Sequence, residues 1–225
     1  MDVRRFRDDL RTLAHRTCKA DGDEVRAKVL STAETLVELY RQNLVKINHS
    51  ALELVCARSL IRQGYEVKVE HRLDSSLVCD VYGEKGEGAL IVEIETGFIP
   101  PEAALQPGVY ARSRIASKIA RYSRFAGKFA LGTTRSYVLD VPRLFVTPAD
   151  SRTAAEAGEV KALTDIYYSR PPISIPEIMR ARVHTIFIID VDSGTTDELD
   201  PEAYLRGVSE YSGNRHAAQG LYVNH

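Results

Sequence analysis

The sequence predicts an α/β protein in which helices flank a mixed sheet on both sides, with further segments at both ends. Three features support this prediction. Residues 1–47 have helical periodicity, the pattern changes after Gly64 to the two-residue alternation of strands, and a basic amphipathic helix follows the third strand. A chain of 225 residues, 44% of them hydrophobic, can bury one sizeable core. We therefore expect one domain with additions at each end.

The first half of the chain divides into helices followed by strands. A long amphipathic helix begins at Asp23, charged on one side and apolar on the other. Ser50 and Glu53 have capping-box spacing for the next helix, and Gly64 suits its C-terminus. Alternating residues and a Gly-containing turn at 84–88 then predict strands over 65–73, 77–83 and 89–96.

The second half begins with a proline-containing loop at 97–108. A helix is predicted from about 109 to 126, with an apolar stripe on one side and basic residues on the other. Short strands are expected at 129–134 and 144–147. Beyond Pro148 the pattern predicts an alanine-rich helix, a loop at 171–176, a strand at 183–191 and an acidic stretch through Glu202.

Composition limits the function classes. The formal net charge is −1 and the pI about 6.6, so no global field attracts nucleic acid or an anionic membrane. The chain has three cysteines, and no two of them form a CxxC pair: Cys18, Cys56 and Cys79. This argues against zinc or a disulfide framework and suits a reducing cytosol. The N-terminus has no apolar leader and no run reaches a membrane-spanning length. We expect a soluble, cytoplasmic protein without a membrane partner.

Acidic residues on two neighbouring predicted strands form the candidate site. Asp80 lies on one strand, and Glu93 and Glu95 lie two residues apart on the next, which places both glutamates on one face. Clustered carboxylates repel one another unless a cation lies among them, and oxygen ligands favour Mg²⁺ or Mn²⁺. His49 and His71 have no partners at metal-ligand spacing, and we interpret both as structural.

Residues 48–134 resemble the PD-(D/E)XK nuclease superfamily, whose fold is restriction-endonuclease-like. The order helix, strand, strand, strand, helix, strand is similar, and Glu53, Asp80 and Glu93 fall at acidic positions of the family pattern. Glu95 occupies the place where the family usually has lysine, and Cys79 stands where the name-giving proline would be. A subset of restriction endonucleases uses such a Glu-x-Glu variant.

The resemblance implies a nuclease-like core at 48–147, an N-terminal helical extension at 1–47 and a C-terminal extension at 148–225 that packs on the core. It implies a Mg²⁺- or Mn²⁺-dependent endodeoxyribonuclease that hydrolyses DNA, or RNA, by direct attack of water, and a homodimer by analogy with such nucleases.

Each candidate residue has a predicted role. Asp80 and Glu93 would hold the first ion, and Glu95 would orient or deprotonate the water or help to bind a second ion. The carboxylate of Glu53 would find its cationic partner in a metal ion bound through a bridging water. Lys118, on the basic face of the following helix, would replace the missing lysine. The phosphate contacts expected from the same helix are Arg114, Arg121 and Arg124.

Other interpretations of the same residues stay open at this point. Glu53 can be half of a capping box, and a basic helix face is commonly a solvated face. The whole domain can be a catalytically silent nuclease-like module that binds nucleic acid or scaffolds a complex. Residues 187–196 are similar to the nucleophile loop of haloacid-dehalogenase-like phosphatases, but the chain after Asp192 is too short for that fold, and we interpret the segment as a strand followed by a polar turn.

Overall fold

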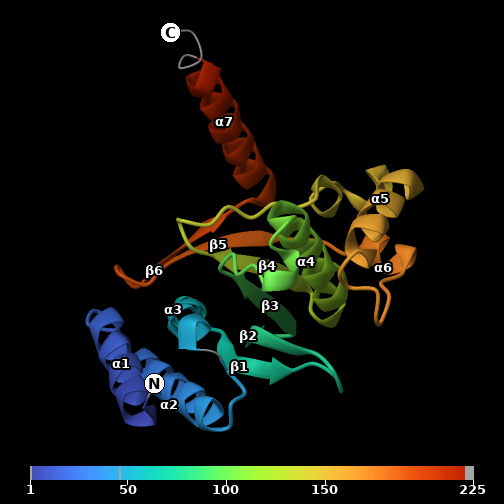
Figure 1. Ribbon diagram of the computed structural model, residues 1–225. Helices are drawn as coiled ribbons and strands as arrows, with labels where there is room; N and C mark the ends of the chain where they lie inside the picture. Colours follow the sequence, from blue (N-terminus) through green and yellow to red (C-terminus); the bar gives the residue numbers. More distant parts are fainter. Residues whose placement is uncertain (1, 46, 221–225) are drawn as a thin grey trace.

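The computed structural model describes residues 2–45 and 47–220 and has a six-stranded mixed sheet between two layers of helices (Figure 1). The strands lie in sequence order, β1 to β6. Antiparallel pairs form both ends of the sheet, whereas β3, β4 and β5 are parallel to one another. The predicted α/β class with a mixed, helix-flanked sheet is confirmed.

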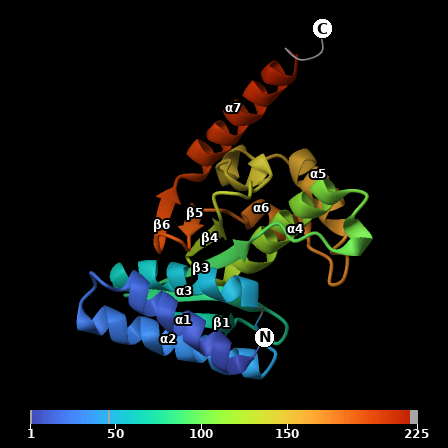
Figure 2. The same cartoon turned by 60° about the vertical axis from the view of Figure 1, so that its left-hand side comes forward.

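Three helices cover one face of the sheet (Figure 2): α1 (Val3–Thr17), α2 (Asp23–Arg41) and α3 (Ile47–Arg62). Their apolar sides meet Val81, Val92 and Ile94 of the sheet in one core. Helix α3 is also fixed by a buried ion pair, in which Nε of Arg58 lies 2.6 Å from Oδ2 of Asp21 at the α1–α2 turn. This anchoring matters because α3 carries two residues of the candidate site.

The strands that carry the predicted acidic residues are β1 (Glu66–Arg72), β2 (Val78–Lys85) and β3 (Gly88–Glu95). A tight turn joins β2 to β3, where Gly86 has a φ of 59° that glycine adopts without steric cost. Strand β3 ends before Gly97, whose φ of 79° turns the chain away and whose Cα is so close to the Tyr137 ring that a Cβ would clash.

The opposite face is covered by helices from the middle of the chain: α4 (Pro107–Tyr122), α5 (Ala154–Asp165) and α6 (Ile175–Arg180). Helix α4 is the crossover between parallel strands β3 and β4 (Lys128–Thr133). Its apolar side packs on Ile91 and Phe129 in a second core. The sheet is completed by β5 (Thr185–Asp190) and β6 (Thr195–Leu199), and α7 (Pro201–Gly220) projects from the body (Figures 1 and 2).

Four short 3₁₀ turns lie in the connections: η1 (Pro101–Ala103), η2 (Ser123–Phe125), η3 (Arg143–Phe145) and η4 (Ala149–Ser151). The strand predicted at 144–147 is therefore wrong. Leu144 and Phe145 are apolar because they fill the α4-side core from a turn that follows Pro142. The expected order of helix, three strands, helix and strand is confirmed as α3-β1-β2-β3-α4-β4.

Two further predictions are settled at the local level. Ser50 does not cap a helix, because α3 begins at Ile47 and both Ser50 and Glu53 lie inside it. The capping-box interpretation of Glu53 is therefore wrong. The expected polar turn after Asp190 is present, and one oxygen of this carboxylate accepts the backbone N–H groups of Asp192 and Ser193 between β5 and β6. No helix of the described residues is both long and apolar enough to cross a membrane.

Candidate metal and phosphate site

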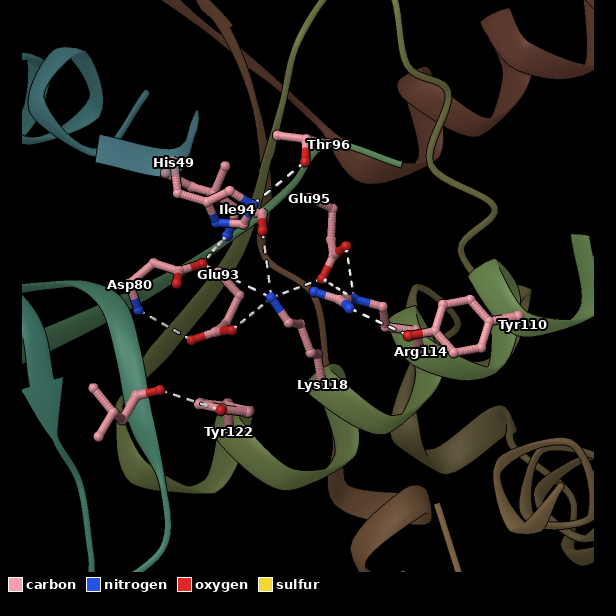
Figure 3. A network of polar contacts seen from close by, with 11 residues as sticks. His49, Asp80, Glu93, Ile94, Glu95, Thr96, Tyr110, Arg114, Lys118 and Tyr122 are labelled. Carbon is pink, nitrogen blue, oxygen red and sulfur yellow. Dashed lines mark hydrogen bonds and ion pairs between the residues drawn. The ribbon is translucent and has the colours of Figure 1, made fainter. Parts of the chain in front are cut away.

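Three carboxylates converge on the ammonium group of Lys118 (Figure 3). Its Nζ lies 2.7 Å from Oε1 of Glu95, 2.9 Å from Oε2 of Glu93 and 3.8 Å from Oδ2 of Asp80. It also donates to the carbonyl oxygen of Ile94 at 3.3 Å. The predicted convergence of Asp80, Glu93 and Glu95 is thus present, and the predicted helical lysine lies at its centre.

The local structure explains why these groups meet. Glu93 and Glu95 share the face of β3 that also carries Ile91, whereas Val92 and Ile94 face α1–α3. Helix α4, which leads to β4, crosses the face that carries Glu93 and Glu95. Lys118 and Arg114 are four residues apart and so project from the same side of α4.

Asp80 lies where β2 and β3 separate. The regular pairing between the two strands stops at Val81 and Val92. Beyond that point side chains replace backbone partners: the Asp80 N–H donates to Oε1 of Glu93 at 3.2 Å, and the Ile94 N–H donates to Oδ2 of Asp80 at 2.5 Å. These bonds hold both carboxylates in fixed positions between the strands.

Glu95 is clamped by two cations. Arg114 Nε lies 3.0 Å from each of its carboxylate oxygens, in addition to the Lys118 contact. Burial by itself would raise the pKa of Glu95, but Lys118 and Arg114 outweigh it and hold that pKa below its ordinary value. A carboxylate with a lowered pKa is a weak base. Glu95 therefore suits the role of a fixed counter-ion better than that of a proton acceptor.

Glu93 and Lys118 respond to the same surroundings in different ways. Burial, followed by the charge of Asp80, raises the pKa of Glu93 to about 8 against the opposing effect of Lys118. Burial would lower the pKa of Lys118, but the three carboxylates raise it well above its ordinary value. Lys118 is accordingly a permanent cation at neutral pH.

A second group of ligand atoms adjoins this cluster. His49, Glu53 and Asp80 each offer one ligand atom, and these atoms all lie within 4.8 Å of one another. Glu53 is fully buried, and in the described part of the chain neither of its carboxylate oxygens has a hydrogen-bond partner. Burial and the charge of Asp80 raise the pKa of Glu53 well above its ordinary value. A buried carboxylate without a partner is costly, and a cation would relieve that cost.

His49 completes this trio as a neutral ligand. Burial lowers the pKa of its imidazole, which keeps the ring uncharged at neutral pH and able to bind a metal. The Thr96 hydroxyl lies 3.3 Å from Nε2 of His49 and helps to orient the ring (Figure 3). Two carboxylates and one imidazole nitrogen match a divalent cation in charge and in donor type. The residues present therefore fit a metal ion.

The trio differs from the predicted ligand set. Glu93 and Glu95 were expected beside Asp80 around the ion, but both of them contact Lys118. The group of candidate metal ligands in the structure instead joins Asp80 with Glu53 and His49. Sequence reasoning interpreted His49 as structural, whereas the structure places it beside Glu53 and Asp80. The usable signal was its position four residues before Glu53, which places both side chains on one face of a helix.

Glu70 is a residue that sequence reasoning missed. It lies across from Asp80, between the paired positions Val69–Val81 and His71–Cys79. Its φ of 47° is unusual for a residue that is not glycine, so the backbone of β1 is strained beside the site. Burial and the charge of Asp80 raise the pKa of Glu70 to about 7. No periodicity in the sequence indicates this distortion.

The predicted phosphate-binding arginines fall into two groups. Arg114 is at the site, with about a quarter of its side chain exposed. Arg121 instead donates to the carbonyl oxygens of Tyr168 and Pro171, and Arg124 lies beside Asp74 and Glu177. These partners of Arg121 and Arg124 thus lie outside the group formed by Asp80, Glu93 and Glu95.

Comparison with known proteins assigns no family. No protein-family model and no curated protein matches the chain. A similarity to a solved structure was found for a protein of unknown function from Silicibacter pomeroyi, with 13% sequence identity, over 76% of this chain and 86% of that chain, at a TM-score of 0.32. The function must therefore be inferred from the geometry of the site.

Proposed function

We propose that this protein is a nuclease of the restriction-endonuclease type that depends on Mg²⁺ or Mn²⁺ and hydrolyses phosphodiester bonds in DNA. One observation carries the proposal. The buried carboxylate of Glu53, for which the described residues provide no hydrogen-bond partner, faces Asp80 and His49, directly beside a lysine held among further carboxylates. The order α3-β1-β2-β3-α4-β4 supports the same family.

The metal would be held by His49, Glu53 and Asp80. A bound divalent ion supplies charge stabilisation for the phosphate and a lowered pKa for the attacking water. An imidazole nitrogen in the ligand set favours Mn²⁺ over Mg²⁺, which prefers oxygen ligands. We infer that Mn²⁺ supports the higher activity.

The remaining residues would position and stabilise the phosphate. Lys118 presents a permanent positive charge beside Asp80, and that charge stabilises the negative charge that builds up on the phosphate during attack. Glu93 and Glu95 hold the ammonium in place. Arg114, partly exposed at the same site, is positioned to contact a neighbouring phosphate of the polymer.

A cleavage assay tests the proposal. The purified protein is incubated with Mn²⁺, Mg²⁺ or a chelator and with single-stranded, duplex or branched DNA and with RNA. Metal-dependent products that disappear in Asp80→Asn and persist in Glu87→Gln, an exposed residue of the β2–β3 turn, support a nuclease. Metal-independent binding without products from any substrate would instead favour the silent nucleic-acid-binding module.

A further inference from the structure

The hydroxyl group of Tyr110 lies between the candidate site and the connection from α5 to α6. Tyr110 is in the first turn of α4 and is buried. Its hydroxyl oxygen accepts a hydrogen bond from Nη1 of Arg114 at 3.3 Å, as Figure 3 shows. The rings of Tyr167 and Tyr168, in the α5–α6 connection, pack against the ring of Tyr110. Tyr110 therefore joins two parts of the fold that are distant in sequence.

Tyr168 is itself held in place. Its carbonyl oxygen accepts a hydrogen bond from Nη2 of Arg121 at 3.2 Å, and the same nitrogen donates to the Pro171 carbonyl at 2.7 Å. The ring of Tyr110 also packs against both neighbouring tyrosines, edge-on at 5.2 Å to Tyr167 and tilted at 6.4 Å to Tyr168. The Tyr110 hydroxyl thus has little freedom to move.

The contacts continue from Tyr110 to the lysine. Arg114 uses Nη1 for Tyr110 and Nε for both oxygens of Glu95, and Glu95 Oε1 contacts Nζ of Lys118 at 2.7 Å. A planar guanidinium group that is bound at two separate nitrogens has a fixed orientation. Bound only at Nε, it can swing about that contact and let the Glu95 carboxylate turn with it.

We propose that Tyr110 is a positioning residue which, through Arg114 and Glu95, sets the position of Lys118, and that the α5–α6 connection contributes to the site through Tyr168. This inference rests on the proposed function for its effect on cleavage. Its structural part, the fixing of Arg114 by Tyr110, is independent of any activity.

The test compares Tyr110→Phe with Tyr167→Phe, because each variant removes one hydroxyl and both rings belong to the same aromatic cluster. We expect Tyr110→Phe to lower kcat for DNA cleavage roughly 10- to 100-fold with KM and the Kd for Mn²⁺ unchanged, and Tyr167→Phe to match the wild type. In a Lys118→Met background, Tyr110→Phe should cause no further loss. A merely structural role would lower the residual rate again.

A second readout does not depend on cleavage. In ¹⁵N NMR spectra the Arg114 Nη–H signals should be resolved in the wild type and in Tyr167→Phe, because the bond to Tyr110 restricts rotation of that Nη1 group, and broadened or averaged in Tyr110→Phe. If Tyr110→Phe does not fold, Tyr168→Leu, which removes a ring that packs against Tyr110, replaces it, with the same expected direction. An unchanged Arg114 signal together with an unchanged kcat overturns the inference. If the wild type cleaves nothing, the proposed function fails, and the NMR comparison alone supports or overturns the positioning of Arg114.

Discussion

The ammonium nitrogen of Lys118 lies 2.7 Å from a carboxylate oxygen of Glu95, although one residue comes from α4 and the other from β3. In the nuclease family that we propose for this protein, the strand position of Glu95 is usually lysine. The helix therefore brings a cation to the place that a lysine on the strand would reach. For electrostatic stabilisation, the position of the charge matters and the element that carries it does not.

Replacing Lys118 by methionine should slow cleavage strongly and weaken the fold. We expect at least a 100-fold loss of rate, an order of magnitude typical of removing one stabilising charge. Without metal, the free energy of unfolding should fall by about 3 kcal/mol, because Glu93 and Glu95 lose a buried partner. Cleavage assays and urea unfolding measure the two effects. Lys128→Met, at an exposed residue, is the control, and equal losses in both variants would contradict the role of Lys118.

A lysine moved from the helix to the strand should restore part of the activity. Lys118→Ala removes the ammonium, and the added change Glu95→Lys returns one to the same neighbourhood, since the two side chains touch. We expect the double variant to cleave at least about tenfold faster than Lys118→Ala alone, because the charge again lies beside the phosphate. A double variant no faster than the single one would show that the helical origin of the lysine is essential.

The sequence was sufficient for strands β1 to β5 and for the acidic residues on β2 and β3, but it did not predict β6. Alternation places Glu93 and Glu95 on one face of β3, and that inference needs no tertiary information. The role of His49 depends on how α3 packs against β2, and the strain at Glu70 depends on how β1 pairs with β2. Such relationships arise only when the elements meet, so local periodicity cannot reveal them.

The same limit applies to the basic helix face. Helical spacing correctly groups Lys118, Arg114 and Arg121 on α4. It does not say that Arg121 finds its partners in the α5–α6 connection, because those carbonyls come from residues about 50 positions away. The sequence alone therefore does not distinguish a basic side chain that is bonded within the fold from one that is free to bind phosphate.

The pH dependence of stability should report on Glu93. Its pKa is raised to about 8 in the folded chain from an ordinary value of 4.5. Between these values the folded protein keeps a proton that the unfolded chain has released, so this contribution to stability is complete below about pH 4.5 and is lost as the pH rises through about 8. Glu93→Gln cannot titrate and avoids that loss.

Thermal melting without divalent metal measures this effect. We measure the Tm of Glu93→Gln minus the Tm of the wild type at each pH. We expect this difference to be at least about 2 °C larger near pH 9 than near pH 5. Adding Mn²⁺ should reduce the difference, because a nearby cation favours the ionised carboxylate of the wild type. A Tm difference that is the same at both pH values would contradict the raised pKa.

Removing His49 should change the preference among metals. In His49→Ala we expect the affinity for Mn²⁺ to fall roughly tenfold or more, with a smaller effect on Mg²⁺, because only the imidazole nitrogen is lost. Calorimetric titration with each ion measures the change. His71→Ala is the matched control, since His71 stacks on Tyr82 and belongs to no described ligand group. Equal losses for both ions would indicate that His49 only supports the fold.

Titration of the protein with Mn²⁺, followed by electron paramagnetic resonance, tests the central claim most directly. It compares the wild type with Glu53→Gln, which keeps the shape of the side chain but not its charge, and with the exposed Glu87→Gln as control. The account predicts a bound Mn²⁺ in the wild type and in Glu87→Gln, and binding at least about tenfold weaker in Glu53→Gln. Binding of equal affinity in all three proteins, or no binding in the wild type, would contradict it.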